Sequence, residues 1–425
     1  MKNENIIIGK SIPKREAIDK VTGKAIFVAD IKLPKMLYAK MVYSPHPHAL
    51  VKEIDTKKTE KMPGVKAVIT AKDIPDKVFY ALDTGPYYPL NDHVRCLGDA
   101  IAAVAADTEE LAEKAVEQIE VKYEVLPAVF DPEEAMKPDA PKLHPDGNIS
   151  DPGGEPEILA WGDTEKGLKE ADFVAKGTFR MPKILHAAIE PRACIAKWDK
   201  DKLTIWAATQ APFFLRHALA DYFEIPVNNI TVKTNNLGGG FGGKKDEQHF
   251  TIISLLAKKN DQPVKFVYTR DTDSMLRSRW GAVTKAKVGV KKDGTITAID
   301  IDQVYDVGAY GCPEGGSGST MGLINVAIYR TVNCRIKAYN VNTNTVTTQK
   351  LRSVYVPTYR FSVEQLMDMI EEWLGKEPGE LRLEKNIKPG EKIMPYGNIM
   401  DNHAMDICLK KAKETAEWSK KWKGW

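Results

Sequence analysis

The stretch LGGGFGGK, from Leu237 to Lys244, places five glycines around a single phenylalanine. Glycine has no Cβ, so such a loop can take left-handed backbone conformations and can lie flat against a bulky group. Its bare amide N–H groups can also donate several hydrogen bonds from one concave surface. The run can therefore form a loop that cradles a ligand, and the alternatives that glycines alone leave open are a flexible turn and a close-packed bulge.

Further segments lie on both sides of this loop in a fixed order. They read VTGKAIFVADIKLPKMLYAKMVYSPHPHA (21–49), LGDAIAAVAADTEELAEKAVEQIEVKYEVLPAV (97–129), HAAIEPRACIAKWD (186–199), TQAPFFLR (209–216), VYTRDTDSMLRSR (267–279), DVGAYG (306–311) and LRSVYVPTYRFSVEQLMDMI (351–370). In this order and at this spacing the chain resembles the large, molybdenum-binding subunit of the xanthine dehydrogenase and aldehyde oxidase family of molybdenum hydroxylases. The resemblance covers nearly the whole chain.

The resemblance implies a mixed α/β (α+β) fold in two parts. Residues 1–135 would form an α/β-hammerhead domain, residues 136–160 a linker, and residues 161–425 the first half of a molybdenum cofactor-binding domain. The linker assignment also rests on six prolines between residues 131 and 157, where no apolar periodicity is present.

Local patterns predict several elements directly. The apolar run DAIAAVA, from Asp99 to Ala105, is typical of a buried strand. Asp107 or Thr108 can cap a helix that follows it, with apolar residues on one face. Two further helices are predicted at 362–374 and 402–418.

Composition limits the possible functions. The 425 residues exceed a single ordinary core, and the 61 basic residues nearly balance the 58 acidic ones, which gives nucleic-acid binding little support. No stretch approaches the ~18 apolar residues of a membrane span, so a cytoplasmic protein is the default expectation. The five scattered cysteines form no Cys-x-x-Cys pair, and they are expected to be reduced and mostly buried.

The resemblance also implies roles for individual residues. In this family molybdenum is held by the dithiolene sulfurs of a pterin, so no protein ligand to the metal is expected. Gln210 matches a glutamine whose amide hydrogen-bonds a molybdenum oxygen, and Arg352 matches an arginine beside the substrate, where a guanidinium can stabilise negative charge. Gly239, Gly240, Phe241 and Gly242 match the loop that faces metal and pterin. Phe241, Lys245, Val354 and Tyr355 are the expected lining of a substrate pocket.

Each of these residues also has a structural interpretation. Gln210 could be a surface glutamine at a strand end, Phe241 an ordinary core residue, and Arg352 one member of a structural ion pair. Glu190, although it matches the family, is interpreted as structural rather than catalytic.

The chain departs from the family pattern at several positions. Where the family has Arg-Gly-x-Gly-x-Pro, this chain reads Arg352-Ser353-Val354-Tyr355-Val356-Pro357, so both glycines are replaced. Ser353 stands where copper-containing carbon monoxide dehydrogenases carry a cysteine, which disfavours that activity. Lys245 stands where xanthine-oxidising enzymes tend to have a glutamate, and Trp280-Gly281 replaces a His-Pro pair for which the pattern alone offers no account.

The expected function is that of one subunit in a larger enzyme. The family's large subunit usually continues for several hundred residues beyond the position where this chain ends, and the catalytic glutamate lies in that additional part. We therefore expect a second molybdopterin-binding subunit to carry this glutamate. 2Fe-2S clusters and FAD are expected on partner subunits, and the cytosine dinucleotide form of molybdopterin on this one. The small-molecule substrate would be an N-heteroaromatic such as a purine or nicotinate, hydroxylated with oxygen from water. The alternatives are a non-catalytic scaffold or assembly subunit and an aldehyde-oxidising member.

Overall fold

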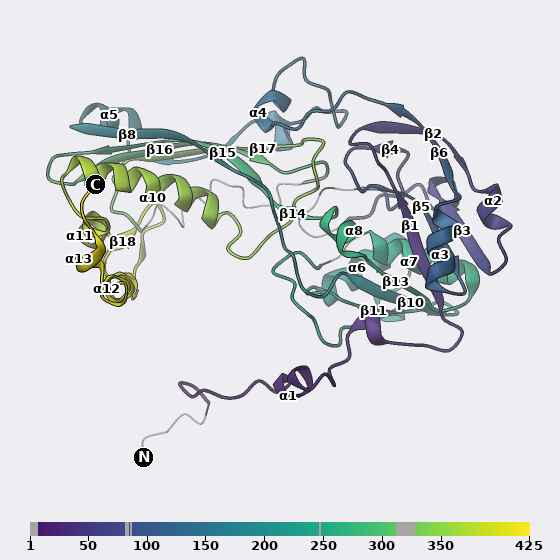
Figure 1. Ribbon diagram of the computed structural model, residues 1–425. Helices are drawn as coiled ribbons and strands as arrows, with labels where there is room; N and C mark the ends of the chain where they lie inside the picture. Colours follow the sequence, from purple (N-terminus) through teal and green to yellow (C-terminus); the bar gives the residue numbers. More distant parts are fainter. Residues whose placement is uncertain (1–6, 81–84, 86, 246–247, 312–327) are drawn as a thin grey trace.

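A computed structural model describes residues 7–80, 85, 87–245, 248–311 and 328–425. Figure 1 shows two lobes, each built around one large sheet. Each lobe has its own main cluster of buried apolar side chains. The mixed α/β fold class is therefore confirmed.

The first lobe contains a seven-stranded mixed sheet. Its strand order is β12 (Ile230–Lys233), β11 (Lys202–Ala207), β10 (Ala193–Asp199), β13 (Val264–Val267), β1 (Leu37–Tyr43), β5 (Ala100–Ala106) and β3 (Val65–Thr70). β1 pairs with β13, and β11 with β12, in parallel, whereas the other neighbours are antiparallel. The helices of this lobe are α3 (Glu109–Val116), α6 (Pro212–Phe223), α7 (His249–Asn260) and α8 (Arg270–Ser274).

Strand β5 is buried on both faces, as its apolar run predicts. Ala103 and Ala105 belong to the core that includes α7, whereas Ala102 and Val104 belong to the core beside α3. Alternation along a strand sends successive side chains to opposite faces, so a sheet covered on both sides needs an uninterrupted apolar sequence. Of the two predicted caps for α3, Thr108 is the one used, since its hydroxyl accepts a hydrogen bond from Leu111 N at 3.1 Å.

A smaller antiparallel sheet completes the N-terminal part. It consists of β4 (His93–Val94), β2 (Ala49–Asp55) and β6 (Glu120–Val125), with short helices α1 (Ala17–Val21), α2 (Lys57–Glu60) and α4 (Pro132–Ala135) elsewhere in this region. Figure 1 shows the segment that carries α1 extending away from both lobes.

The second lobe contains a five-stranded sheet and the helices near the C-terminus. The strand order is β7 (Glu157–Trp161), β17 (Cys334–Val341), β16 (Ile296–Asp306), β15 (Gly281–Val290) and β8 (Phe173–Met181), and α10 (Val356–Trp373) lies along β8 and β15 (Figure 1). The remaining elements are α5 (Thr164–Lys169), α11 (Glu380–Lys385), α12 (Met405–Thr415), α13 (Trp418–Lys421) and the hairpin of β18 (Lys392–Ile393) and β19 (Asn398–Ile399). Between the lobes, β9 (Ile184–Leu185) pairs with β14 (Ser278–Arg279).

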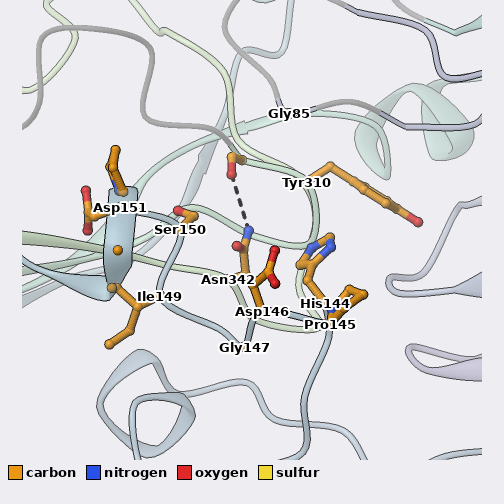
Figure 2. A pocket seen from close by; sticks show the side chains of 14 residues that line it. Gly85, His144, Pro145, Asp146, Gly147, Ile149, Ser150, Asp151, Tyr310 and Asn342 are labelled. Atoms are coloured by element: carbon orange, nitrogen blue, oxygen red, sulfur yellow. Dashed lines mark hydrogen bonds between the residues drawn. The ribbon is translucent and has the colours of Figure 1, made fainter.

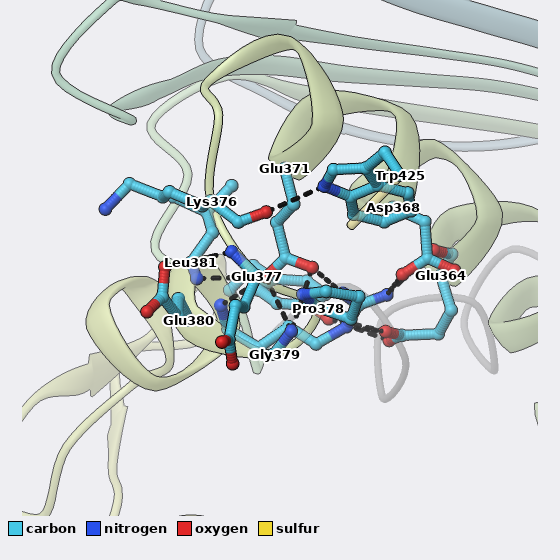
Figure 3. Close-up of polar contacts among 12 residues, drawn as sticks. Glu364, Asp368, Glu371, Lys376, Glu377, Pro378, Gly379, Glu380, Leu381 and Trp425 are labelled. Carbon is cyan, nitrogen blue, oxygen red and sulfur yellow. Dashed lines mark hydrogen bonds and ion pairs between the residues drawn. The ribbon is translucent and has the colours of Figure 1, made fainter. Parts of the chain in front are cut away.

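A buried cluster of charges joins α10 to α11. Glu371 is fully buried and accepts backbone hydrogen bonds from Gly379 and Leu381 at 2.9 Å, and its carboxylate pairs with Arg382. The guanidinium of Arg382 also contacts Glu364 and Asp368, each at 2.7 Å. Figure 3 shows these acidic side chains gathered at the start of α11. A buried carboxylate needs such partners, so this cluster fixes the position of α11.

The observed elements differ from the predicted boundaries at several points. The seven-stranded sheet takes strands from both sides of the predicted linker, so the boundary near residues 136–160 divides the sequence but not this sheet. β7 lies within the end of that predicted linker, where it forms an edge strand paired with β17. The helix predicted at 402–418 is two helices, because Glu417 has a left-handed backbone (φ 51°) that interrupts it.

The helix predicted at 362–374 begins earlier, at Val356. Pro357 lies in its first turn, where the missing N–H of proline would have no intrahelical partner anyway. This earlier start matters because it brings α10 within four residues of Arg352.

Among the described residues, no helix is both long enough and apolar enough to cross a membrane. Cys96, Cys194 and Cys334 are buried thiols and Cys408 is exposed, while Cys312 lies outside the described residues.

Candidate functional site

The glycine-rich loop is built around the side chain of Gln210. The Oε1 atom of Gln210 accepts hydrogen bonds from the backbone N–H of Gly242 at 2.9 Å and of Lys244 at 3.4 Å. The backbone N–H of Gln210 in turn donates to the Lys244 carbonyl at 2.7 Å. A Cβ at Gly240 would lie 2.4 Å from Gln210 Cδ, so only glycine permits this approach. The structure thus brings Gln210 and the loop together.

Two ion pairs hold the loop from its buried side. Lys244 is 2% exposed, and its ammonium pairs with Glu190 Oε2 at 2.8 Å. The same oxygen accepts a hydrogen bond from Gly238 N at 2.8 Å. Burial lowers the pKa of Lys244, and the neighbouring Glu190 carboxylate opposes this. The arrangement agrees with the structural interpretation of Glu190.

The second pair joins Arg192 and Asp273, 2.8 Å apart, and the Arg192 guanidinium also donates to the carbonyl of Gly243. The sequence patterns did not single out Arg192, Lys244 or Asp273 as functional. All three lie within the segments 186–199, 237–244 and 267–279, which carry the family resemblance, so the resemblance could have drawn attention to them. Their role in this structure is to hold the loop in place.

The segment around Arg352 meets the loop directly. The backbone N–H of Arg352 donates to the Phe241 carbonyl at 2.8 Å. A Cβ at Gly242, whose φ is +101°, would lie 2.2 Å from the Lys350 carbonyl oxygen. These contacts bring residues that are far apart in sequence into one site. The side chains of Gln210, Phe241 and Arg352 are all exposed.

The four residues expected to line a substrate pocket lie in different environments. Phe241 is 43% exposed, and Val354 is half-buried against the core of the second lobe. The carbonyl of Lys245 accepts a hydrogen bond from Thr209 Oγ1, and its side chain is half-buried. Tyr355 is buried, and its ring stacks on Trp280 with a centroid distance of 4.4 Å. The ring of Tyr355 therefore belongs to a core and not to an open pocket, because the stack with Trp280 occupies one of its faces.

A separate hollow of about 700 Å³ lies near Tyr310 and the segment 144–154. Figure 2 shows His144, Ser150 and Asn342 among its lining residues. None of the predicted site residues lines it. Within the part of the chain that the structure describes, no group of three or more histidine, cysteine, aspartate or glutamate side chains is placed to hold a metal ion.

Comparisons with known proteins identify the family of the chain. The family model described as molybdopterin cofactor-binding domain matches residues 148–387, and the aldehyde oxidase and xanthine dehydrogenase a/b hammerhead domain matches residues 22–127. The chain therefore belongs to the xanthine dehydrogenase and aldehyde oxidase family of molybdenum hydroxylases.

Individual relatives match this chain over different shares of their own length. The nicotinate dehydrogenase large molybdopterin subunit of Eubacterium barkeri is 32% identical over 415 residues, which covers 96% of each chain. A probable xanthine dehydrogenase subunit of Bacillus subtilis (strain 168) is 35% identical over 389 residues, 88% of this chain and 50% of that protein. The crystal structure of the aldehyde oxidoreductase from Desulfovibrio desulfuricans ATCC 27774 superposes with a TM-score of 0.88 at 28% identity, over 98% of this chain and 47% of that one. The chain thus spans about half the length of the Bacillus protein and nearly all of the Eubacterium subunit.

Proposed function

We propose that this chain is the molybdenum-binding subunit of a hydroxylase that introduces water-derived oxygen at a C–H carbon of an N-heteroaromatic compound resembling a purine or nicotinate. The observation that carries the proposal is the fixed position of Gln210 on the glycine-rich loop beside Arg352. The similarity to a nicotinate dehydrogenase subunit over nearly its whole length supports the substrate class.

The residues present fit a molybdopterin cofactor. Gln210 and Arg352 are exposed on and beside the loop, so their side chains offer hydrogen-bond donors to the oxygen atoms of a bound cofactor. When bound, the cofactor supplies the redox centre that accepts two electrons from the substrate. We favour its cytosine dinucleotide form.

The side chains of this protein would position the cofactor and the substrate and would polarise their reacting atoms. Because Gln210 Oε1 already accepts hydrogen bonds from the loop, its amide nitrogen is the end left to donate to an oxygen of the cofactor. An uncharged donor does this without neutralising the centre's electrophilicity. The exposed Arg352 guanidinium would stabilise negative charge that develops on a ring atom or carbonyl oxygen of the substrate.

The remaining parts of the enzyme would lie on partner subunits in the cytoplasm. A second molybdopterin-binding subunit would bring the glutamate that acts as the general base, and other subunits would carry 2Fe-2S clusters and FAD. The name of the Eubacterium relative, a large molybdopterin subunit, supports a division of this kind.

The alternative from another class is a scaffold or assembly subunit that has lost activity. The observation that favours it is the Arg352–Pro357 segment, where Tyr355 replaces a family glycine with a buried ring. An aldehyde-oxidising member remains a second alternative, and it would use the same cofactor with a different pocket.

A pair of variants at Gln210 tests the catalytic proposal. Gln210→Glu keeps an oxygen that can accept the Gly242 hydrogen bond but removes the amide donor, whereas Gln210→Ala removes both. We expect the Glu variant to lose about 10²-fold in kcat at unchanged molybdenum content, as for other donors that stabilise developing charge. The measurement is turnover of nicotinate and hypoxanthine by the assembled complex with an artificial electron acceptor.

The Ala variant should lose at least as much turnover and some molybdenum as well, because the loop loses its anchor. Kinetics unaltered in the Glu variant would contradict a donor role for Gln210 and would favour the scaffold alternative.

A further inference from the structure

Three residues other than glycine adopt left-handed backbone conformations where the two loops of the site meet. They are Phe241 (φ 54°), Ser353 (φ 77°) and Val354 (φ 47°). An L-residue in this region crowds its Cβ against the backbone, and for a β-branched side chain such as valine the conformation is a true outlier. Such strain persists only when surrounding contacts enforce it, and it concentrates at functional sites.

Backbone hydrogen bonds enforce the turn locally. Arg352 N donates to Phe241 O at 2.8 Å, and Val356 N donates to Ser353 O at 2.9 Å. The first of these bonds fixes the start of the turn to the glycine-rich loop. The second closes the turn at Val356, the first residue of α10.

An aromatic stack fixes the other end of the turn. The ring of Tyr355 lies on Trp280, with centroids 4.4 Å apart and planes within 20°, and meets Tyr305 edge-on at 4.9 Å. Tyr355 is 5% exposed and Trp280 4%. Trp280 directly precedes β15, and Tyr305 lies within β16, so the stack ties the turn to the five-stranded sheet. Stacked and edge-to-face rings contribute attraction beyond the area that they bury.

We infer that Tyr355 and Trp280 are positioning residues for Arg352. This inference rests on the proposed function, in which the Arg352 guanidinium acts on the substrate. The turn of Ser353 and Val354 is held between Phe241 O on one side and the aromatic stack on the other. If the stack is removed, the two left-handed residues can relax, and the guanidinium moves relative to Gln210 and the loop. The stack thus enforces a backbone conformation that glycines at 353 and 354 would adopt without strain.

A double-mutant cycle between Tyr355 and Arg352 tests this inference in the assembled complex. We expect Tyr355→Phe to keep kcat/KM within about twofold of the parent, because its ring can still stack, and Tyr355→Ala to lower it about tenfold. In an Arg352→Ala background, Tyr355→Ala should cause little further loss, since the group that it positions is gone. Trp280→Phe and Trp280→Ala should behave like the corresponding Tyr355 variants.

If the fold-losses in kcat/KM from Tyr355→Ala and Arg352→Ala simply multiply in the double variant, the inference is overturned. The proposed function would then remain intact. Kinetics unaltered in Arg352→Ala alone would instead contradict the proposed role of Arg352, and the inference would fall with it.

Val354→Gly provides a second test. Glycine accepts the left-handed backbone without strain, so in this variant the turn depends less on the stack to hold its conformation. In the Val354→Gly background we therefore expect Tyr355→Ala or Trp280→Ala to lower kcat/KM only about threefold, against about tenfold in the parent, at unchanged molybdenum content. An equal loss in both backgrounds would overturn the inference.

Discussion

Replacing Gly242 by alanine is expected to remove most of the molybdenum, and with it the activity, from the assembled protein. A Cβ at this position would lie 2.2 Å from the Lys350 carbonyl oxygen and 3.0 Å from its carbon, and φ is +101°. Both partners are backbone atoms, so neither can rotate away. The loop and the 350–352 segment would have to separate, which would break the hydrogen bond between Arg352 N and Phe241 O. A left-handed alanine alone costs about 1–3 kcal/mol, and the displaced backbone adds to that.

Gly390 offers a control with the same backbone strain outside the site. Its φ of +88° is similar, but a Cβ there would meet no described atom within 4 Å. Gly390→Ala should therefore retain most of the molybdenum, and Gly242→Ala about a tenth or less, as measured by elemental analysis of equal amounts of complex. Equal molybdenum in the two variants would show that the contact with Lys350 does not shape the site.

Arg382→Met is expected to have the largest effect on local stability. The change leaves the fully buried Glu371 carboxylate without its cation, and it also removes one of the partners of Glu364 and the ion pair with Asp368. Breaking a buried pair by removing one member costs about 3–5 kcal/mol, which corresponds to a loss of roughly 10²-fold or more in hydrogen-exchange protection. The measurement is amide exchange in residues 371–385 of the assembled protein.

Two comparisons identify the buried charge as the cause. Arg180 is 57% exposed while it pairs with Asp131 and Glu133, so Arg180→Met should cost less than about 1 kcal/mol. Burial already raises the pKa of Glu371. Without Arg382 this pKa rises further, so the folded variant binds the proton more tightly than the unfolded chain does. The loss of stability of Arg382→Met relative to the parent should therefore shrink as the pH falls toward about 5. A loss of stability that does not depend on pH, or that is no larger than the loss in Arg180→Met, would contradict this explanation.

Local features of the fold could be predicted from the sequence because they depend on short-range physics. The apolar run at β5 predicts a strand covered on both faces, and Thr108 is the residue type that caps a helix. The glycine run indicates that something approaches its backbone closely, but that the approaching group is the side chain of Gln210 is known only from the structure. The nearness of Arg352 to the loop was anticipated through the family resemblance and not from spacing.

The rest depends on contacts between distant segments, which one sequence does not display. The pairing of β1 with β13 joins the two predicted domains in one sheet, and nothing in either strand specifies its partner. The stack of Tyr355 on Trp280 joins two departures from the family pattern that have no interpretation separately. Lys244 looks like the end of a flexible loop, yet it is buried because Glu190 lies beneath it.

Whether this chain holds the cofactor can be decided from the molybdenum content per copy of the chain, measured by elemental mass spectrometry on the complex purified from its native source. We predict a ratio close to one, with the partner subunits present. A ratio close to zero while the partners remain bound would contradict cofactor binding by this chain, and would support a scaffold subunit.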